Sequence, residues 1–209
     1  MDENGNITVD SEAYRAALNL FKILVDAGAT PKDSFSYEYA EANAAFGAGQ
    51  VAAMIQWNAA AADLMDPAKT PVTAETTKTI APPAGPEGRF THTHGLGLGV
   101  NASGKNVEGA EAFVRFLSTA EAAKAYALAG GAPGLTSSVV ADIADERPDL
   151  VLLGEYASNY GFVMNGGTAA KALSVYELQA KEFTGFLSGG QSLDEALAKT
   201  EAGMAELLK

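Results

Sequence analysis

The feature that most constrains the fold is the stretch from Phe46 to Asn58, with the sequence FGAGQVAAMIQWN. Its two glycines are typical of a helix C-terminus, because glycine enters the left-handed conformation there without a steric penalty. Residues 50–56 are short and apolar, so they predict a strand buried on both faces, as parallel strands usually are. A buried strand between two helical segments predicts an α/β arrangement.

The only tryptophan of the chain, Trp57, directly follows this predicted strand. We expect Asn58 to cap the alanine-rich helix that comes next, which places Trp57 at the carboxyl end of a strand and against a helix N-terminus. Ligands bind at that edge of open α/β sheets. A large core residue would give the same pattern, since aromatic side chains dominate cores as well as binding sites. From the residues alone, both interpretations of Trp57 stay open.

Helical periodicity and capping residues predict helices over most of the remaining chain. The first is expected over residues 12–27, with Asp10 or Ser11 as its N-cap and Gly28 as its end. The others are expected over residues 38–46, after Asn106, after a capping box of Ser118 and Glu121, over residues 139–144 and 149–156, after Thr168, and after a capping box of Ser192 and Glu195. Gly166 and Gly167 predict a turn.

Residues 95–100 read GLGLGV and alternate glycine with an aliphatic residue. This alternation predicts a strand whose glycine face meets another group at close range. The glycines lie inside the predicted strand, whereas a dinucleotide-binding fingerprint needs them in the turn after a strand. We therefore predict no dinucleotide site.

Composition excludes several classes of function. The formal net charge is −12, with 26 acidic and 14 basic residues, which argues against nucleic acid and anionic lipid as partners. There is no cysteine, so disulfides, thiol catalysis and cysteine-bound metals are excluded. No GxSxG, HExxH or Walker A motif is present, and we predict neither an enzyme nor a cofactor.

The two histidines, His92 and His94, are separated by one threonine. On a strand this spacing points both imidazoles to the same side, as a metal pair requires. Further ligands would have to be carboxylates, and the prediction is two loop histidines that are solvated or contact a ligand, with no metal site. A small enzyme that uses His94 with nearby carboxylates is an alternative hypothesis for this pair.

Taken in order, four segments resemble the extracellular solute-binding proteins that feed ABC importers, in particular the sugar-binding group related to maltose-binding protein. They are ITVDSEAYRAALNLFKILVDAG, EANAAFGAGQVAAMIQWN, GLGLGVNASGKNVEGAEAFVRFLSTAEAAKAY and FLSGGQSLDEAL. The resemblance implies two α/β lobes with the ligand between them, a small-molecule solute that is a sugar, and a membrane permease as partner. It also implies a periplasmic or extracellular location, with a lipid anchor as an option for the full-length protein.

The resemblance further implies that this chain is the later part of such a protein. The expected fold is a periplasmic-binding-protein-like (class II) C-terminal lobe, mostly helical around a small mixed sheet and lacking most of the first lobe. Residues 7–80 and 135–209 are expected to form the second lobe, and residues 81–134 to return to the first. The alternative is a truncated lobe that covers its exposed face by forming a homodimer without binding ligand.

Site residues are carried over from the family only where this chain matches it. Trp57 and the adjacent Asn58 follow a stretch similar to the family's FxxGxxAM strand, although this chain is about two residues shorter there. Tyr176 and Tyr39 match aromatic positions of maltose-binding protein, and Tyr176 fits equally well as a member of its helix's apolar stripe. Where the family commonly reads GGWG, this chain has His94 and Gly95 followed by leucine and glycine, so an aromatic contact is replaced by a polar one.

Overall fold

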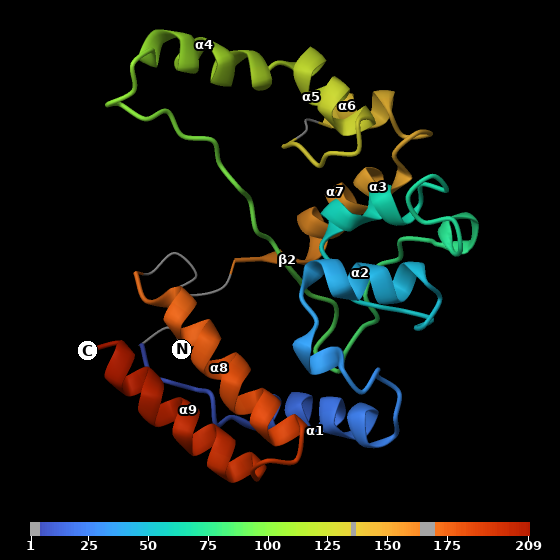
Figure 1. The fold of residues 1–209 in the computed structure, drawn as a ribbon. Coiled ribbons are helices and arrows are strands. Elements are labelled where there is room, and N and C mark those ends of the chain that lie inside the picture. Colours follow the sequence, from blue (N-terminus) through green and yellow to red (C-terminus); the bar gives the residue numbers. More distant parts are fainter. Residues whose placement is uncertain (1–4, 135–136, 164–169) are drawn as a thin grey trace. The chain divides into compact units, whose positions relative to one another are not determined.

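A computed structural model of the chain describes residues 5–134, 137–163 and 170–209 (Figure 1). The chain divides into two compact units. The first unit contains described residues 5–38 and 170–209, and the second unit contains residues 39–163, of which 135 and 136 lie outside the described part. The expected lobe boundaries at residues 81 and 135 stay a prediction.

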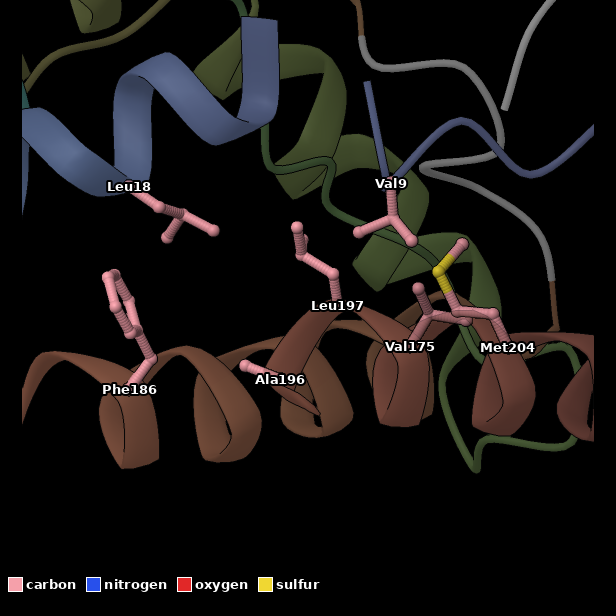
Figure 2. Packing of buried hydrophobic residues seen from close by; sticks show 7 residues of the cluster. All are labelled: Val9, Leu18, Val175, Phe186, Ala196, Leu197 and Met204. Carbon is pink, nitrogen blue, oxygen red and sulfur yellow. The ribbon is translucent and has the colours of Figure 1, made fainter. Parts of the chain in front are cut away.

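The first unit is a small helical bundle built from segments far apart in the sequence. Its core consists of aliphatic and aromatic side chains from the segment before α1, from α1 and from the α8–α9 hairpin, and Figure 2 shows Leu18 of α1 pointing toward Phe186 and Leu197. The elements are α1 (Glu12–Asp26), the 3₁₀ helix η1 (Ser34–Ser36), α8 (Ala172–Leu187) and α9 (Leu193–Leu207). The buried side chains are Val9, Leu18, Val175, Phe186, Ala196, Leu197 and Met204.

Two of the predicted helix starts in this unit are confirmed by their capping hydrogen bonds. The Ser11 side chain accepts a hydrogen bond from the backbone N–H of Tyr14 at the start of α1. At the start of α9, Ser192 and Glu195 form the predicted capping box, in which each side chain accepts from the other residue's backbone N–H. These bonds satisfy amide groups that have no partner within the helix.

A buried carboxylate joins α8 to the loop before α9. Glu182 is buried on α8, and its Oε2 accepts a hydrogen bond of 3.0 Å from Nε2 of Gln191. The same amide donates to the Glu182 carbonyl at 2.8 Å, while Lys199 donates to Oε1 of Gln191 at 2.6 Å. Gly185 leaves room for this amide, because a Cβ there would lie 2.8 Å from Nε2. The hydrogen bond from Gln191 is the main cause that lowers the pKa of Glu182 below its usual 4.5, and the ion pair with Lys181 adds to it.

Acid is therefore expected to weaken the first unit through Glu182. Because the folded-state pKa is lowered, the ionised carboxylate stabilises the folded state above the usual pKa, and this contribution is lost as the pH falls through the folded value. Glu182→Gln should be less stable than the wild type at pH 7 and should show a shallower loss of stability in acid. Urea unfolding followed by circular dichroism between pH 7 and 3 measures both. Gln191→Ala should also make stability depend less steeply on pH. A pH dependence of stability equal to that of the wild type in both variants would contradict this role of Glu182.

The second unit is also mostly helical. Its short strands β1 and β2 pair in parallel, with Thr91 opposite Gly161 and His92 opposite Phe162. These two strands form the only sheet within the described residues. The elements in chain order are α2 (Tyr39–Gly47), η2 (Asn58–Ala60), α3 (Ala61–Leu64), η3 (Ala74–Thr76), β1 (Thr91–His92), α4 (Val107–Leu117), α5 (Ala120–Leu128), α6 (Ser137–Asp142), α7 (Pro148–Tyr160) and β2 (Gly161–Phe162).

A buried ion pair anchors the helices α5, α6 and α7 of this unit around Ala127, Ile143 and Leu150. Arg147 donates from Nε and Nη2 to the two carboxylate oxygens of Asp149, at 2.9 and 2.8 Å. Its Nη1 donates to the carbonyl of Ala127 in the last turn of α5 and, at 2.8 Å, to that of Gly131 just after this helix. The guanidinium therefore ties the end of α5 to the start of α7.

Two predicted strands are wrong. Residues 50–56 form no strand, and Ile55 is 85% exposed, so this segment has neither the ladder partner nor the cover that a buried strand needs. Residues 95–100 also lie outside any strand, with Leu96 94% exposed. A Cβ added at Gly95, Gly97 or Gly99 would meet nothing within 4 Å, so the expected close approach is absent.

Two predicted caps are wrong as well. Ser118 ends α4, where its hydroxyl donates to the Val114 carbonyl, and Thr119 caps α5 by accepting from the backbone N–H of Ala122. Asn58 begins η2 without capping it, since Trp57 holds the N-cap position and no side-chain cap is made. The helix end at Gly49 is confirmed, with a φ of +73° that favours glycine. The predictions for Thr168, Gly166 and Gly167 lie outside the described residues.

Candidate functional site

Two aromatic residues that the family resemblance singled out lie side by side in the second unit. Tyr39 is the first residue of α2, and Trp57 directly precedes η2. Their ring centroids are 5.8 Å apart and the ring planes are inclined by 34°. Trp57 is 73% exposed and Tyr39 is 40% exposed, so both rings have faces open to a ligand. The exposure of Trp57 is inconsistent with a core residue.

Side-chain amides hold the tryptophan segment against α2. Gln56 accepts a hydrogen bond of 2.8 Å from the backbone N–H of Trp57 through its Oε1, and its Nε2 donates to Oδ1 of Asn43 at 2.9 Å. Asn43 lies four residues after Tyr39 on α2, so the two side chains share a helix face. Gln56 thus fixes the backbone of Trp57 relative to the helix that carries Tyr39. We refer to Tyr39, Asn43, Gln56 and Trp57 as the aromatic–amide site.

Asn43 and Gln56 were missed by the sequence reasoning. The signal that could have found Asn43 is its spacing of four from Tyr39 within a predicted helix. The sequence predicts Gln56 as the last residue of a strand, where its side chain would point to one face of a sheet. Without that strand its amide is free to bond to the neighbouring backbone.

His94 and Gly95 follow β1 in the same unit, and both are exposed. The His94 ring lies beside that of His92, with centroids 5.9 Å apart, and His92 in turn contacts the ring of Phe162 at 5.8 Å. Asn58 is partly buried at the start of η2, next to Trp57 in the chain. These positions bring polar groups to the surface of the second unit.

Tyr176 belongs to the first unit, on α8. It is partly buried, whereas its neighbour Val175 is fully part of the core. Val175 and Phe186 of α8 are buried in the core, and Leu178, Phe183 and Leu187 pack against it. The candidate residues are therefore distributed over both units, and a ring contact joins Tyr39 to Trp57.

The described residues contain no group of three or more histidine, aspartate or glutamate side chains arranged to hold a metal ion. The aromatic–amide site itself offers two rings, two amides and a phenol hydroxyl. Such groups suit the recognition of a small neutral solute, because rings pack on apolar faces and amides orient polar groups.

A family model described as bacterial extracellular solute-binding protein matches residues 1–150 of the chain. The chain belongs to the bacterial extracellular solute-binding protein family. The match includes the whole aromatic–amide site, together with His94 and Gly95. No curated protein matches the chain.

Membership of the solute-binding protein family implies a small-molecule ligand and a role as the ligand-binding component of an ABC import system, with a membrane permease as partner. The family is generally non-enzymatic, and its location is periplasmic or extracellular. In residues 5–134, 137–163 and 170–209, no helix is both long and apolar enough to span a membrane. The mostly helical architecture with one small parallel sheet is compatible with part of a solute-binding-protein fold.

Proposed function

We propose that this solute-binding protein binds a sugar or oligosaccharide through the aromatic–amide site of the second unit. Trp57 and Tyr39 form its stacking surface, and His94 and Gly95 supply polar contacts. Tyr176 of the first unit is a further proposed contact, to be tested on its own. The proposal depends mainly on one observation, the pairing of an exposed tryptophan with a tyrosine at a ring-centroid distance of 5.8 Å.

The chemistry of the pair suits a carbohydrate. A pyranose ring has faces of C–H groups that pack against aromatic rings, while its hydroxyls need hydrogen-bonding partners around the edge. Trp57 is 73% exposed, so most of its surface is accessible for such a contact. With a net charge of −12, the protein also favours a neutral ligand over an anionic one.

The amides of the site support the same assignment. Gln56 fixes the backbone on which the indole is mounted, so less conformational freedom is lost when a ligand stacks on the ring. Amide oxygens and nitrogens accept and donate hydrogen bonds in equal measure, which matches hydroxyl groups. The site thus combines a positioned indole ring with the side-chain amides of Gln56 and Asn43.

Tryptophan fluorescence provides a direct test, because Trp57 is the only tryptophan in the chain. The full chain is titrated with glucose, maltose, maltotriose, cellobiose and xylobiose, and isothermal calorimetry is run on the same panel. We expect at least one sugar to give saturable changes in both measurements with the same dissociation constant. Heat and fluorescence that stay flat for the whole panel would overturn the sugar assignment.

Trp57→Ala is expected to weaken binding of the responding sugar by roughly 30-fold or more, as removal of a central aromatic contact typically does. Tyr39→Ala and Tyr176→Ala should each have smaller effects, and Trp57→Phe should restore part of the affinity. Phe113→Ala, which removes a 59% exposed ring on α4 of the same unit, is the matched control and should bind like the wild type. Calorimetry measures all five variants, and wild-type affinity in Trp57→Ala would contradict the proposed role of the indole.

A further inference from the structure

The second unit has a pair of imidazoles that the sugar-binding proposal leaves largely unexplained. We propose that His92 and His94 together chelate a divalent transition-metal ion of the zinc, copper and nickel class. The sequence alone predicted no metal site here, and His94 is also a proposed sugar contact, but the metal proposal is based on the geometry of the two rings and does not depend on sugar binding.

The backbone that carries His92 is paired with β2 as far as the amide of Thr93. His92 lies in β1 opposite Phe162 of β2, and the backbone N–H of Thr93 donates to the Phe162 carbonyl at 2.8 Å. The extended conformation therefore continues past His92, and residues two apart on extended backbone point to the same side. The ring of His92 is held between two neighbours, Phe162 at 5.8 Å and His94 at 5.9 Å.

The distance between the imidazoles is compatible with a shared metal ion. A metal–nitrogen bond is about 2 Å long and the ring centre lies about 1 Å beyond the nitrogen, so two imidazoles on one ion have centroids no more than about 6.5 Å apart. The observed separation of 5.9 Å is within this limit, at an interplanar angle of 37°. Imidazole nitrogens suit zinc, copper and nickel, whereas magnesium and calcium prefer oxygen ligands.

The remaining coordination positions would be taken by water or by an external ligand. Within the described residues, no third histidine, aspartate or glutamate completes a metal-holding group. Both histidines are exposed, so solvent reaches the open positions. The net charge of −12 raises the local concentration of cations around the protein. The geometry therefore favours an open, exchangeable two-histidine site over a closed structural one.

Proton NMR tests the pair directly, because the chain has only these two histidines and therefore only two sets of imidazole signals. The untagged full chain is titrated with zinc chloride, and substoichiometric copper(II) is added in a second series. We expect zinc to shift both sets with one shared, saturable midpoint, copper to broaden both equally, and EDTA to reverse the changes. Signals that respond with different midpoints, or only one set that responds, would overturn the chelate.

Variants that keep a ring but remove its nitrogens separate chelation from binding by scattered carboxylates. His92→Phe and His94→Phe should each weaken zinc binding measured by calorimetry by roughly tenfold or more, because the second imidazole binds intramolecularly in the wild type. Thr93→Ser is the matched control between them and should leave the affinity unchanged. Circular dichroism confirms that each variant is folded. Wild-type zinc affinity in both phenylalanine variants would overturn the proposal, whatever the outcome of the sugar titrations.

Discussion

Replacing Asp149 by alanine is expected to lower the free energy of unfolding of the second unit by about 3–5 kcal/mol, because it leaves a buried guanidinium without its counter-charge. The side chains of Arg147 and Asp149 are 7% and 1% exposed, and the pair is bidentate. Arg147 would retain only its two carbonyl partners at the end of α5. Urea unfolding measures the change, with Trp57 in the same unit as the fluorescent probe.

Two further variants decide whether burial is the cause. Glu111→Ala breaks an exposed pair with Arg115 on α4 and should cost less than about 1 kcal/mol. The double change Arg147→Met with Asp149→Ala removes both charges and should recover part of the loss, since no unpaired charge stays buried. A loss below about 1 kcal/mol in Asp149→Ala itself would show that the pair does not hold α5 to α7.

Leu197→Ala is expected to destabilise the first unit by about 2–5 kcal/mol, the usual cost of truncating a fully buried leucine. Leu197, a residue of α9, is 0% exposed and packs in one core cluster with Leu18 of α1 and Val175 of α8 (Figure 2). The cavity would therefore open where the three helices meet. Urea unfolding followed by circular dichroism, together with hydrogen exchange at the amides of α8 and α9, detects the loss.

Leu173→Ala provides the matched control for this truncation. Leu173 is a leucine on α8 that is 69% exposed, and its loss should change stability by no more than about 0.5 kcal/mol. Similar effects of the two substitutions would indicate that the packing around Leu197 is not the core of this unit.

The helices of this chain can be predicted from the sequence because their capping residues lie within a few positions of each helix start. Ser11, Asn106 and the pair of Ser192 and Glu195 each satisfy backbone groups within a few residues, and all three helix starts are found where they were predicted. The boundary between α4 and α5 was misplaced by one residue, because Ser118 and Thr119 have similar capping chemistry. Both hydroxyls donate to a carbonyl of α4, Ser118 to Val114 and Thr119 to Phe116, and that of Thr119 also accepts from the backbone N–H of Ala122 in α5.

The strands cannot be predicted in the same way, because a strand depends on a partner strand elsewhere in the chain. Residues 50–56 and 95–100 have the composition of strands but no neighbour to pair with in the described structure. The strands that do form, at Thr91 and at Gly161, are two residues long and carry no periodicity to detect. Their pairing joins segments that are far apart in the sequence, which local patterns do not encode.

For the candidate site, the resemblance identified the two aromatic residues but local reasoning misplaced their surroundings. Trp57 was expected at the end of a buried strand and is instead exposed beside Tyr39. Its supporting amide, Gln56, is recognisable only once the strand is absent. Ligand roles for Trp57, Asn58, Tyr176, His94, Gly95 and Tyr39 stay predictions, as does the homodimer.

The first unit draws its core from two distant stretches of the chain, and this has a consequence during protein synthesis. Helix α1 leaves the ribosome well before α8 and α9, whose side chains cover Leu18. At translation speeds of about 5–20 residues per second, that delay is roughly 10–35 s. The continuous second unit is completed during this interval. The apolar side chains of α1 therefore have no core partners in the nascent chain until the α8–α9 hairpin has been translated.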